Sequence, residues 1–212
     1  MLRATEALTR AGIPYIGPGA AVLQLCYDKL AASERVAAAG FDCPAPSTSF
    51  PMVIKPRRGS DSIGVRLAHS GPIPAGHIGQ EWVRGAELTI AYIGGSVGAP
   101  LRIVLPEGAL YTFARKYLLR PRRELAGGAL VERARETALT IARLLDVDWA
   151  ARIDFIYEPR RDRLCFLECD VAPLVGAGSA FAESLAAGGM SRAEQLRRLT
   201  IGACSSPISA PT

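Results

Sequence analysis

Hydrophobic residues recur along this chain with two different periods, and the period decides which element each stretch predicts. Spacings of three and four residues, as at Val131, Ala134, Ala138, Ala142 and Leu145, indicate a helix. Alternation or short β-branched and aromatic runs bounded by Gly and Pro indicate strands. Helices are expected over residues 1–11, 20–27, 29–39, 130–145, 181–187 and 192–201, and strands over 51–56, 79–83, 87–93, 100–105, 110–113, 152–157 and 164–169.

The last two strands form a hairpin whose polar residues need an explanation. Period two places Glu168 and Asp170 on one face of their strand, and Arg152 and Asp154 share a face of theirs. Close carboxylates repel unless a cation lies among them, and oxygen ligands suit Mg²⁺ held together with substrate phosphates. The alternative is a solvated hairpin whose acids pair with the arginines of its turn, Arg160, Arg161 and Arg163.

A second polar stretch follows the strand at residues 51–56, which ends in Lys55 and Pro56. Residues 57–65 contain two arginines, two glycines and two serines, so backbone N–H groups and cations there could close over phosphates. The Walker pattern is not matched, because the lysine precedes the glycines. A plain Gly/Ser hairpin turn is the alternative.

Composition narrows the class of protein. The chain has 212 residues, 49% of them hydrophobic, and 25 Lys and Arg against 20 Asp and Glu, a balance that suits phosphorylated or carboxylate ligands. Zinc-finger spacing and long basic helices are missing from the sequence, so nucleic acid is not an expected partner. No apolar run could span a bilayer and the N-terminus lacks a signal-peptide core, so we expect a cytoplasmic protein without a membrane partner.

Seven short motifs, in this order, resemble the ATP-grasp superfamily and within it the D-alanyl-D-alanine ligase branch. The resemblance covers residues 11–199. The motifs are Gly12-Ile-Pro-Tyr-Ile-Gly17; Asp28-Lys29; Val53-Ile-Lys55-Pro56 with its Gly/Ser loop; Gln80-Glu81-Trp82-Val83 with Gly85 and Glu87; Arg115-Lys116-Tyr117; Arg152-Ile-Asp154-Phe; and Leu167-Glu168-Cys-Asp170 with Pro173 and Ser179.

This resemblance implies an α+β ATP-grasp fold in which two α+β subdomains hold the nucleotide between their sheets. Residues 1–43 would be linker helices remaining from an N-terminal domain, 44–95 a small lid subdomain, 96–204 the catalytic subdomain and 205–212 a disordered tail. The implied activity is an ATP- and Mg²⁺-dependent ligation of a carboxylate to an amine through an acyl phosphate, with amino acids or other small carboxylates as substrates. Phosphoryl transfer of this kind needs positioning and charge neutralisation rather than a nucleophilic side chain.

The resemblance also implies a role for each matched residue. Asp154, Glu168 and Asp170 would bind two Mg²⁺ ions, Arg152 would stabilise the oxyanion of a tetrahedral intermediate, and Ser179 would receive the carboxylate of the amine substrate. Lys116 would contact the γ-phosphate. The remaining ATP contacts would come from Lys29, Lys55, Arg57, Arg58, Gly59, Ser60, Ser62, Glu81, Trp82, Val83, Glu87 and Leu167.

The sequence departs from the family pattern in three ways. The preceding N-terminal domain, which holds part of the first substrate's site, is missing, so a homodimer or a partner chain could supply it. Asp170 stands where the ligases have Asn, and Ala172-Pro173-Leu174 replaces a Ser-Pro-Gly. Arginines at residues 120–123 suggest an acidic substrate. The alternative function is a nucleotide-binding module or pseudo-enzyme without turnover; a basic interaction protein without a nucleotide is a third.

Overall fold

The strands of this protein form two separate antiparallel sheets. The structure, a computed structural model, describes residues 2–60, 62–119 and 121–201. The smaller sheet has the order β2-β1-β3 and comprises β1 (Met52–Pro56), β2 (Arg66–Ala68) and β3 (His77–Glu81). The larger has the order β7-β6-β4-β8-β9, with β5 paired to β4, and comprises β4 (Ala86–Ile93), β5 (Ser96–Val97), β6 (Leu101–Ile103), β7 (Arg123–Leu125), β8 (Ala150–Glu158) and β9 (Arg163–Asp170).

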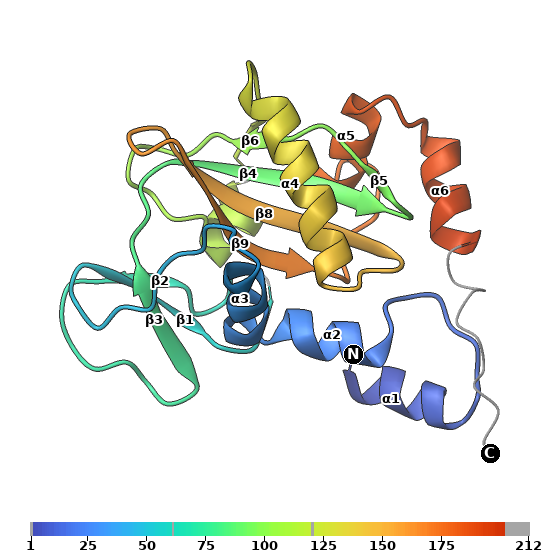
Figure 1. Cartoon of the computed structure of the whole chain (residues 1–212), viewed down its shortest axis with the longest axis horizontal. Coiled ribbons are helices and arrows are strands. Elements are labelled where there is room, and N and C mark those ends of the chain that lie inside the picture. The colour runs from blue at the N-terminus through green and yellow to red at the C-terminus, as the bar shows by residue number, and fades with distance from the viewer. Residues whose placement is uncertain (1, 61, 120, 202–212) are drawn as a thin grey trace.

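Helices cover both faces of the larger sheet. The α-helices are α1 (Leu2–Arg10), α2 (Ala20–Tyr27), α3 (Lys29–Ala38), α4 (Leu130–Leu144), α5 (Ala180–Ala187) and α6 (Arg192–Ile201), and a π-helix, η1, spans Arg115–Leu119. In Figure 1, α4 crosses the larger sheet, α3 lies next to the smaller sheet, α2 and α1 lead away from it toward the lower right, and α5 and α6 lie at the upper right. The resulting α+β architecture is the predicted fold class.

Alternation along β4 explains where the site lies. Leu88, Ile90 and Tyr92 join the core with α2, α3 and α4. On the other face, Ala91 and Ile93 pack against α5 and α6, as does Ala150 of β8. Glu87 and Thr89 lie on that second face, because side chains two apart on a strand point the same way. The second face is therefore apolar where helices cover it and polar beyond them.

A glycine makes the crossing between the sheets possible. Gly85 lies between β3 and β4, and a Cβ on it would lie 2.0 Å from the carbonyl oxygen of Tyr157 in β8. Any side chain there would push the start of β4 away from β8. The division between the two sheets thus falls at this glycine. The predicted boundary between a lid and a catalytic subdomain, after residue 95, stays a prediction.

Most predicted elements are present, but one strand prediction is wrong. Residues 110–112 are irregular, and residues 113 and 114 are helical and lead into η1. The physical reason is that β6 can pair on only two sides: β4 takes one, and β7, a strand the periodicity did not indicate, takes the other. The short strands β2 and β5 were also missed. The predicted tail, 205–212, lies outside the described residues.

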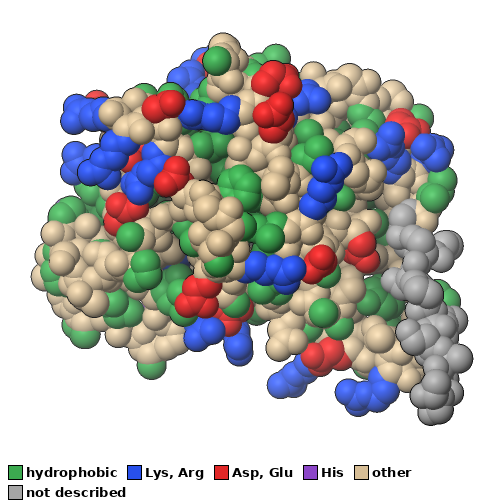
Figure 2. Space-filling view, in the orientation of Figure 1, with side chains coloured by type: hydrophobic (Ala, Val, Ile, Leu, Met, Phe, Trp, Pro, Cys, Tyr) green, Lys and Arg blue, Asp and Glu red, His purple; other side chains and the backbone are tan. Residues whose placement is uncertain are grey.

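The charged side chains on the surface that Figure 2 shows do not mark the position of the site. The face that carries α4 shows Lys and Arg side chains interspersed with Asp and Glu (Figure 2). In the described part of the chain, no helix has the length and apolar composition needed to cross a membrane.

Candidate functional site

Four charged side chains from β8 and β9 form the centre of the candidate site. Asp154 pairs with Glu168 across the two strands, and Arg152 pairs with Asp170. This register places all four on the face that packs against α5 and α6, beyond the part that those helices cover. The convergence of three carboxylates expected from the alternation is confirmed.

The cation among these carboxylates in the structure is Arg152. Its Nη2 lies 2.9 Å from Asp154 Oδ2 and 3.8 Å from Glu168 Oε1, and its Nη1 lies 3.4 Å from Asp170 Oδ2. Burial alone would lower the pKa of the Arg152 guanidinium, but the three carboxylates raise that pKa well above its ordinary value. Arg152 therefore stays charged at all physiological pH values.

The same carboxylates could hold a metal ion only together with oxygen atoms of a bound ligand. Among the residues that the structure describes, no three His, Cys, Asp or Glu side chains are arranged to hold a metal ion by themselves. Glu168 and Asp170 are 24% and 22% exposed, whereas Asp154 is 11% exposed and bonded to Thr89 and Arg152. One or two carboxylates completed by phosphate oxygens form the usual Mg²⁺ arrangement, which this donor set fits. The number of ions stays a prediction.

A cavity opens over this cluster, between the two sheets. Lys55 of β1 and Glu168 of β9 both line it, so the lysine-bearing strand does face the acidic hairpin. We call it the nucleotide cavity because twelve predicted residues line it: Lys29, Lys55, Ser62, Glu81, Trp82, Val83, Glu87, Lys116, Arg152, Asp154, Leu167 and Glu168. Leu110 and Tyr111 line it as well, and sequence reasoning missed them by assigning residues 110–113 to a strand.

All three lysines of the chain lie in this cavity. They are Lys29, Lys55 and Lys116, whereas the other basic residues are arginines. Lys29 Nζ donates to the carbonyl oxygen of Gly59 and lies 3.9 Å from Glu168 Oε2. Burial and the nearby charge of Lys29 lower the pKa of Lys55 to about 8, against the opposing effect of Glu168. The scarcity of lysine was a signal of the site that sequence analysis did not use.

The segment between the sheets forms one wall of the cavity. Glu81 Oε1 accepts a hydrogen bond from the backbone N–H of Ala45 at 3.2 Å and lies 2.9 Å from Nη1 of Arg163. Trp82 stacks under the Arg84 guanidinium, 4.1 Å from the ring centroid. The Glu81 carboxylate is thus already oriented by two partners from distant parts of the chain.

Glu87 is a half-buried acid among other charges in the nucleotide cavity. Burial raises the pKa of its carboxyl to about 8, and the carboxylates of Asp154 and Glu168 add to that rise. Near neutral pH, Glu87 is therefore largely protonated in the ligand-free protein and can donate as well as accept a hydrogen bond.

The two arginines of the predicted phosphate loop pair with an aspartate outside the nucleotide cavity. Arg57 and Arg58 do not line the cavity, because both pair with Asp28, at 2.8 Å and 3.3 Å. Asp28 also accepts a hydrogen bond from the N–H of Ala31 and so caps α3. These contacts tie the loop to the helix that carries Lys29, and direct contact of the two arginines with phosphates stays a prediction.

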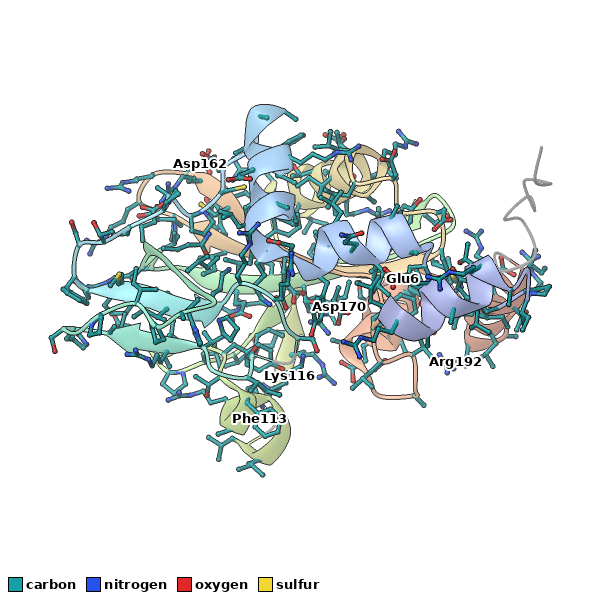
Figure 3. The ribbon with its side chains drawn as sticks, turned by 90° about the horizontal axis from the view of Figure 1, so that it is seen from below. Glu6, Phe113, Lys116, Asp162, Asp170 and Arg192 are labelled. Atoms are coloured by element: carbon teal, nitrogen blue, oxygen red, sulfur yellow. The ribbon has the colours of Figure 1, made fainter. Side chains whose placement is uncertain are left out.

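A second cavity adjoins the first. It shares Lys116, Arg152 and Glu168 with the nucleotide cavity, and Gly59, Ser60 and Asp170 also line it. Figure 3 shows Lys116 and Asp170 close to each other in the space between the smaller sheet and α1. We call it the second cavity below.

Ser179 caps a helix in this structure. Its hydroxyl accepts a hydrogen bond from the N–H of Ala182 at 3.1 Å and caps α5. It is not among the residues that line either cavity. Contact of Ser179 with a substrate carboxylate stays a prediction.

Two family profiles and several curated relatives match this chain. Residues 26–108 match the family profile described as ATP-grasp domain, and residues 78–200 match the one described as D-ala D-ala ligase C-terminus. The D-alanine--D-alanine ligase of Nitrosospira multiformis is 27% identical over 196 residues, which is 79% of this chain and 63% of the relative. That of Acidiphilium cryptum is 30% identical over 189 residues, 76% of this chain and 62% of the relative.

Solved structures show the same fold. VanG D-Ala:D-Ser ligase from Enterococcus faecalis superposes with a TM-score of 0.79 at 23% identity, over 93% of this chain and 67% of that chain. The ATP complex of D-alanine--D-alanine ligase from Bacillus anthracis gives 0.74 at 17% identity, over 93% of this chain and 72% of that chain. The chain thus spans about two thirds of the length of these proteins. Since the ligase profile matches more than half of its residues, the chain belongs to the D-alanine--D-alanine ligase family of ATP-grasp proteins.

Proposed function

We propose that this protein is an ATP- and Mg²⁺-dependent ligase that joins a small carboxylate, such as an amino acid, to an amine through an acyl phosphate. The observation that carries the proposal is the shared boundary of the two cavities: Lys116, Arg152 and Glu168 line both. A phosphate chain in one and a carboxylate in the other would meet at these residues.

The charges at that boundary suit phosphoryl transfer. The substrate carboxylate oxygen attacks the γ-phosphorus, the bond from that phosphorus to the bridging oxygen breaks, and ADP leaves. Lys29, Lys55 and Lys116 face the developing charge from three elements, and neutralising equatorial phosphate oxygens is the main task in such reactions. Mg²⁺ held by Glu168 and Asp170 would neutralise further charge on the phosphates.

We assign the second step to Arg152. The amine attacks the acyl carbon, the carbonyl oxygen becomes an oxyanion, and phosphate then leaves as the amine loses its proton. The buried Arg152 guanidinium is held at one edge by Asp154, and its Nη1 and Nη2 atoms also lie 3.4 Å from Asp170 and 3.8 Å from Glu168, where the two cavities meet. Preorganised donors of this kind stabilise an oxyanion without reorganisation.

The second cavity reaches the protein surface. Tyr27 and Leu174, on its rim, are 43% and 63% exposed. We infer that a second copy of the chain, or a partner chain, completes the substrate site. Sedimentation of the chain alone and with a candidate partner, with and without ATP, tests this.

Hydroxylamine trapping tests the proposed chemistry. With ATP, Mg²⁺ and a panel of amino acids and simple carboxylic acids, an acyl phosphate yields a hydroxamate and releases phosphate in equal amount. Arg143→Met is a matched control, because Arg143 lies on α4 and lines neither cavity; Lys116→Met should abolish hydroxamate and Arg143→Met should not. ATP binding with no phosphate release from any acid, alone or with a partner chain, would instead identify a nucleotide-binding module without turnover.

A further inference from the structure

The second cavity has one charged end, Gly59 and Ser60 from the loop after β1, and otherwise a mainly apolar lining. Leu23, Cys26, Cys169 and Val171 form its buried wall, each at most 6% exposed, and Tyr27, Ala172 and Leu174 continue it toward the surface. Because β9 is the edge strand, the cavity extends past the edge of the sheet and reaches α2. The apolar wall therefore comes from segments that are far apart in the sequence.

The charged end lies where the two cavities meet. The charged residues that line the second cavity are Lys116, Arg152, Glu168 and Asp170. Arg152 lies within 4 Å of both of these carboxylates, so these three charges form one group. A ligand can thus place one carboxylate at this group, and the rest of it meets only uncharged residues.

Arg122 and Arg123, two of the arginines that suggested an acidic substrate, form ion pairs with glutamates of the protein itself. Arg122 pairs with Glu124, and Arg123 donates to both oxygens of Glu183, at 2.6 Å and 2.7 Å. Neither lines the second cavity, and Arg120 lies outside the described residues. The described arginines of this segment therefore supply no partner for a second carboxylate on the substrate.

We propose that the second cavity selects a carboxylate substrate with an apolar side chain larger than methyl, of about the size of leucine. This inference rests on the proposed function and deepens it by naming the substrate class. Each additional buried methylene strengthens binding about fourfold. Leucine should therefore bind at least tenfold more tightly than alanine, while the side-chain carboxylate of glutamate loses its water without gaining a partner.

The direct test is calorimetric titration of the full chain, saturated with Mg²⁺ and a non-hydrolysable ATP analogue. Leucine, alanine and glutamate, each as both enantiomers, are the probes. Binding of either leucine enantiomer at least tenfold more tightly than the corresponding alanine and glutamate supports the proposal. Equal or tighter binding of alanine or glutamate, or no binding of any probe, overturns it. Phosphate release, measured in separate samples that contain ATP in place of the analogue, judges the proposed ligase chemistry independently.

Substitution of two exposed leucines tests whether the preference for leucine arises in the second cavity, and neither substitution should disturb the fold. Leu174 is 63% exposed and lines the second cavity, whereas Leu196, on α6, is 47% exposed and lines neither cavity. Leu174→Ser should reduce the preference for leucine over alanine by a factor of about three or more, and Leu196→Ser should leave it unchanged. An unchanged preference in Leu174→Ser would show that the selectivity arises outside this cavity.

Discussion

Thr89 Oγ1 donates a hydrogen bond to Asp154 Oδ1 at 2.7 Å, and both side chains are buried. The two residues face each other across β4 and β8, so strand pairing brings them together. Arg152 holds Asp154 from the other side through its Nε and Nη2 atoms. Asp154 is thereby oriented from two directions before any ligand arrives, and Thr89 is a positioning residue of the site that no motif in the sequence indicated.

Thr89→Val should lower both stability and function. It keeps the side-chain shape but leaves Asp154 without one donor in a buried place, which costs about 1.5–3 kcal/mol for a bond to a charged group. The free energy of unfolding in urea measures this. Thr89→Ser retains the hydroxyl and is the control: it should recover most of the stability and the affinity for Mn²⁺ in the presence of ATP. Equal losses in both variants would contradict the positioning role.

Nucleotide affinity should depend on the ionisation of Lys55. Its pKa in the ligand-free folded state is about 8, below the ordinary value of 10.5, so the unfolded chain binds more protons between these values and stability rises with pH over that window. Phosphate favours the ammonium form, so ATP should bind more weakly as pH rises through about 8.

Because the chain has only three lysines, the ionisation of Lys55 can be followed by NMR. After reductive ¹³C-methylation, NMR should show only three lysine side-chain signals besides the N-terminal amine, one of them titrating near pH 8, and ATP should shift all three. ATP titrations at pH 7 and 9 give the affinity change, and Lys55→Met should flatten it. Identical affinities at the two pH values in the unaltered protein would be inconsistent with this role.

Glu87→Gln should stabilise the ligand-free protein near neutral pH. The pKa of Glu87 is raised to about 8, so the folded state binds more protons than the unfolded chain between about pH 4.5 and 8, and stability falls as pH rises through that window. Removing the ionisable group should therefore stabilise by roughly 1–3 kcal/mol at pH 8 and by much less at pH 5. Glu107→Gln, on an exposed loop, makes the same change of charge and should have little effect at either pH.

Asp28 should prove essential to the phosphate loop. Asp28→Ala removes the cap of α3 and the partner of both Arg57 and Arg58, so we expect a loss of about 2 kcal/mol or more in the free energy of unfolding. Asp28→Asn keeps a capping oxygen but not the charge, so its loss should be about half as large. ATP affinity should fall in both. Unchanged ATP affinity in Asp28→Ala would show that the loop does not depend on this anchor.

Local patterns were enough to predict most elements and the central cluster. The period of two along β8 and β9 places Arg152 with Asp154 and Glu168 with Asp170 whatever the rest of the chain does, because side-chain direction in a strand is a local property. The order of the seven motifs likewise pointed to the family. These features depend on residues that are near one another in the chain.

Only the folded chain decided which partners those side chains take. Arg57 and Arg58 pair with Asp28, Arg163 with Glu81, and β6 with β7 rather than with residues 110–113. Thr89 and the apolar wall of the second cavity became part of the site in the same way. Each of these contacts joins segments distant in sequence, and charges and strand edges can choose among several partners until packing brings one of them within reach.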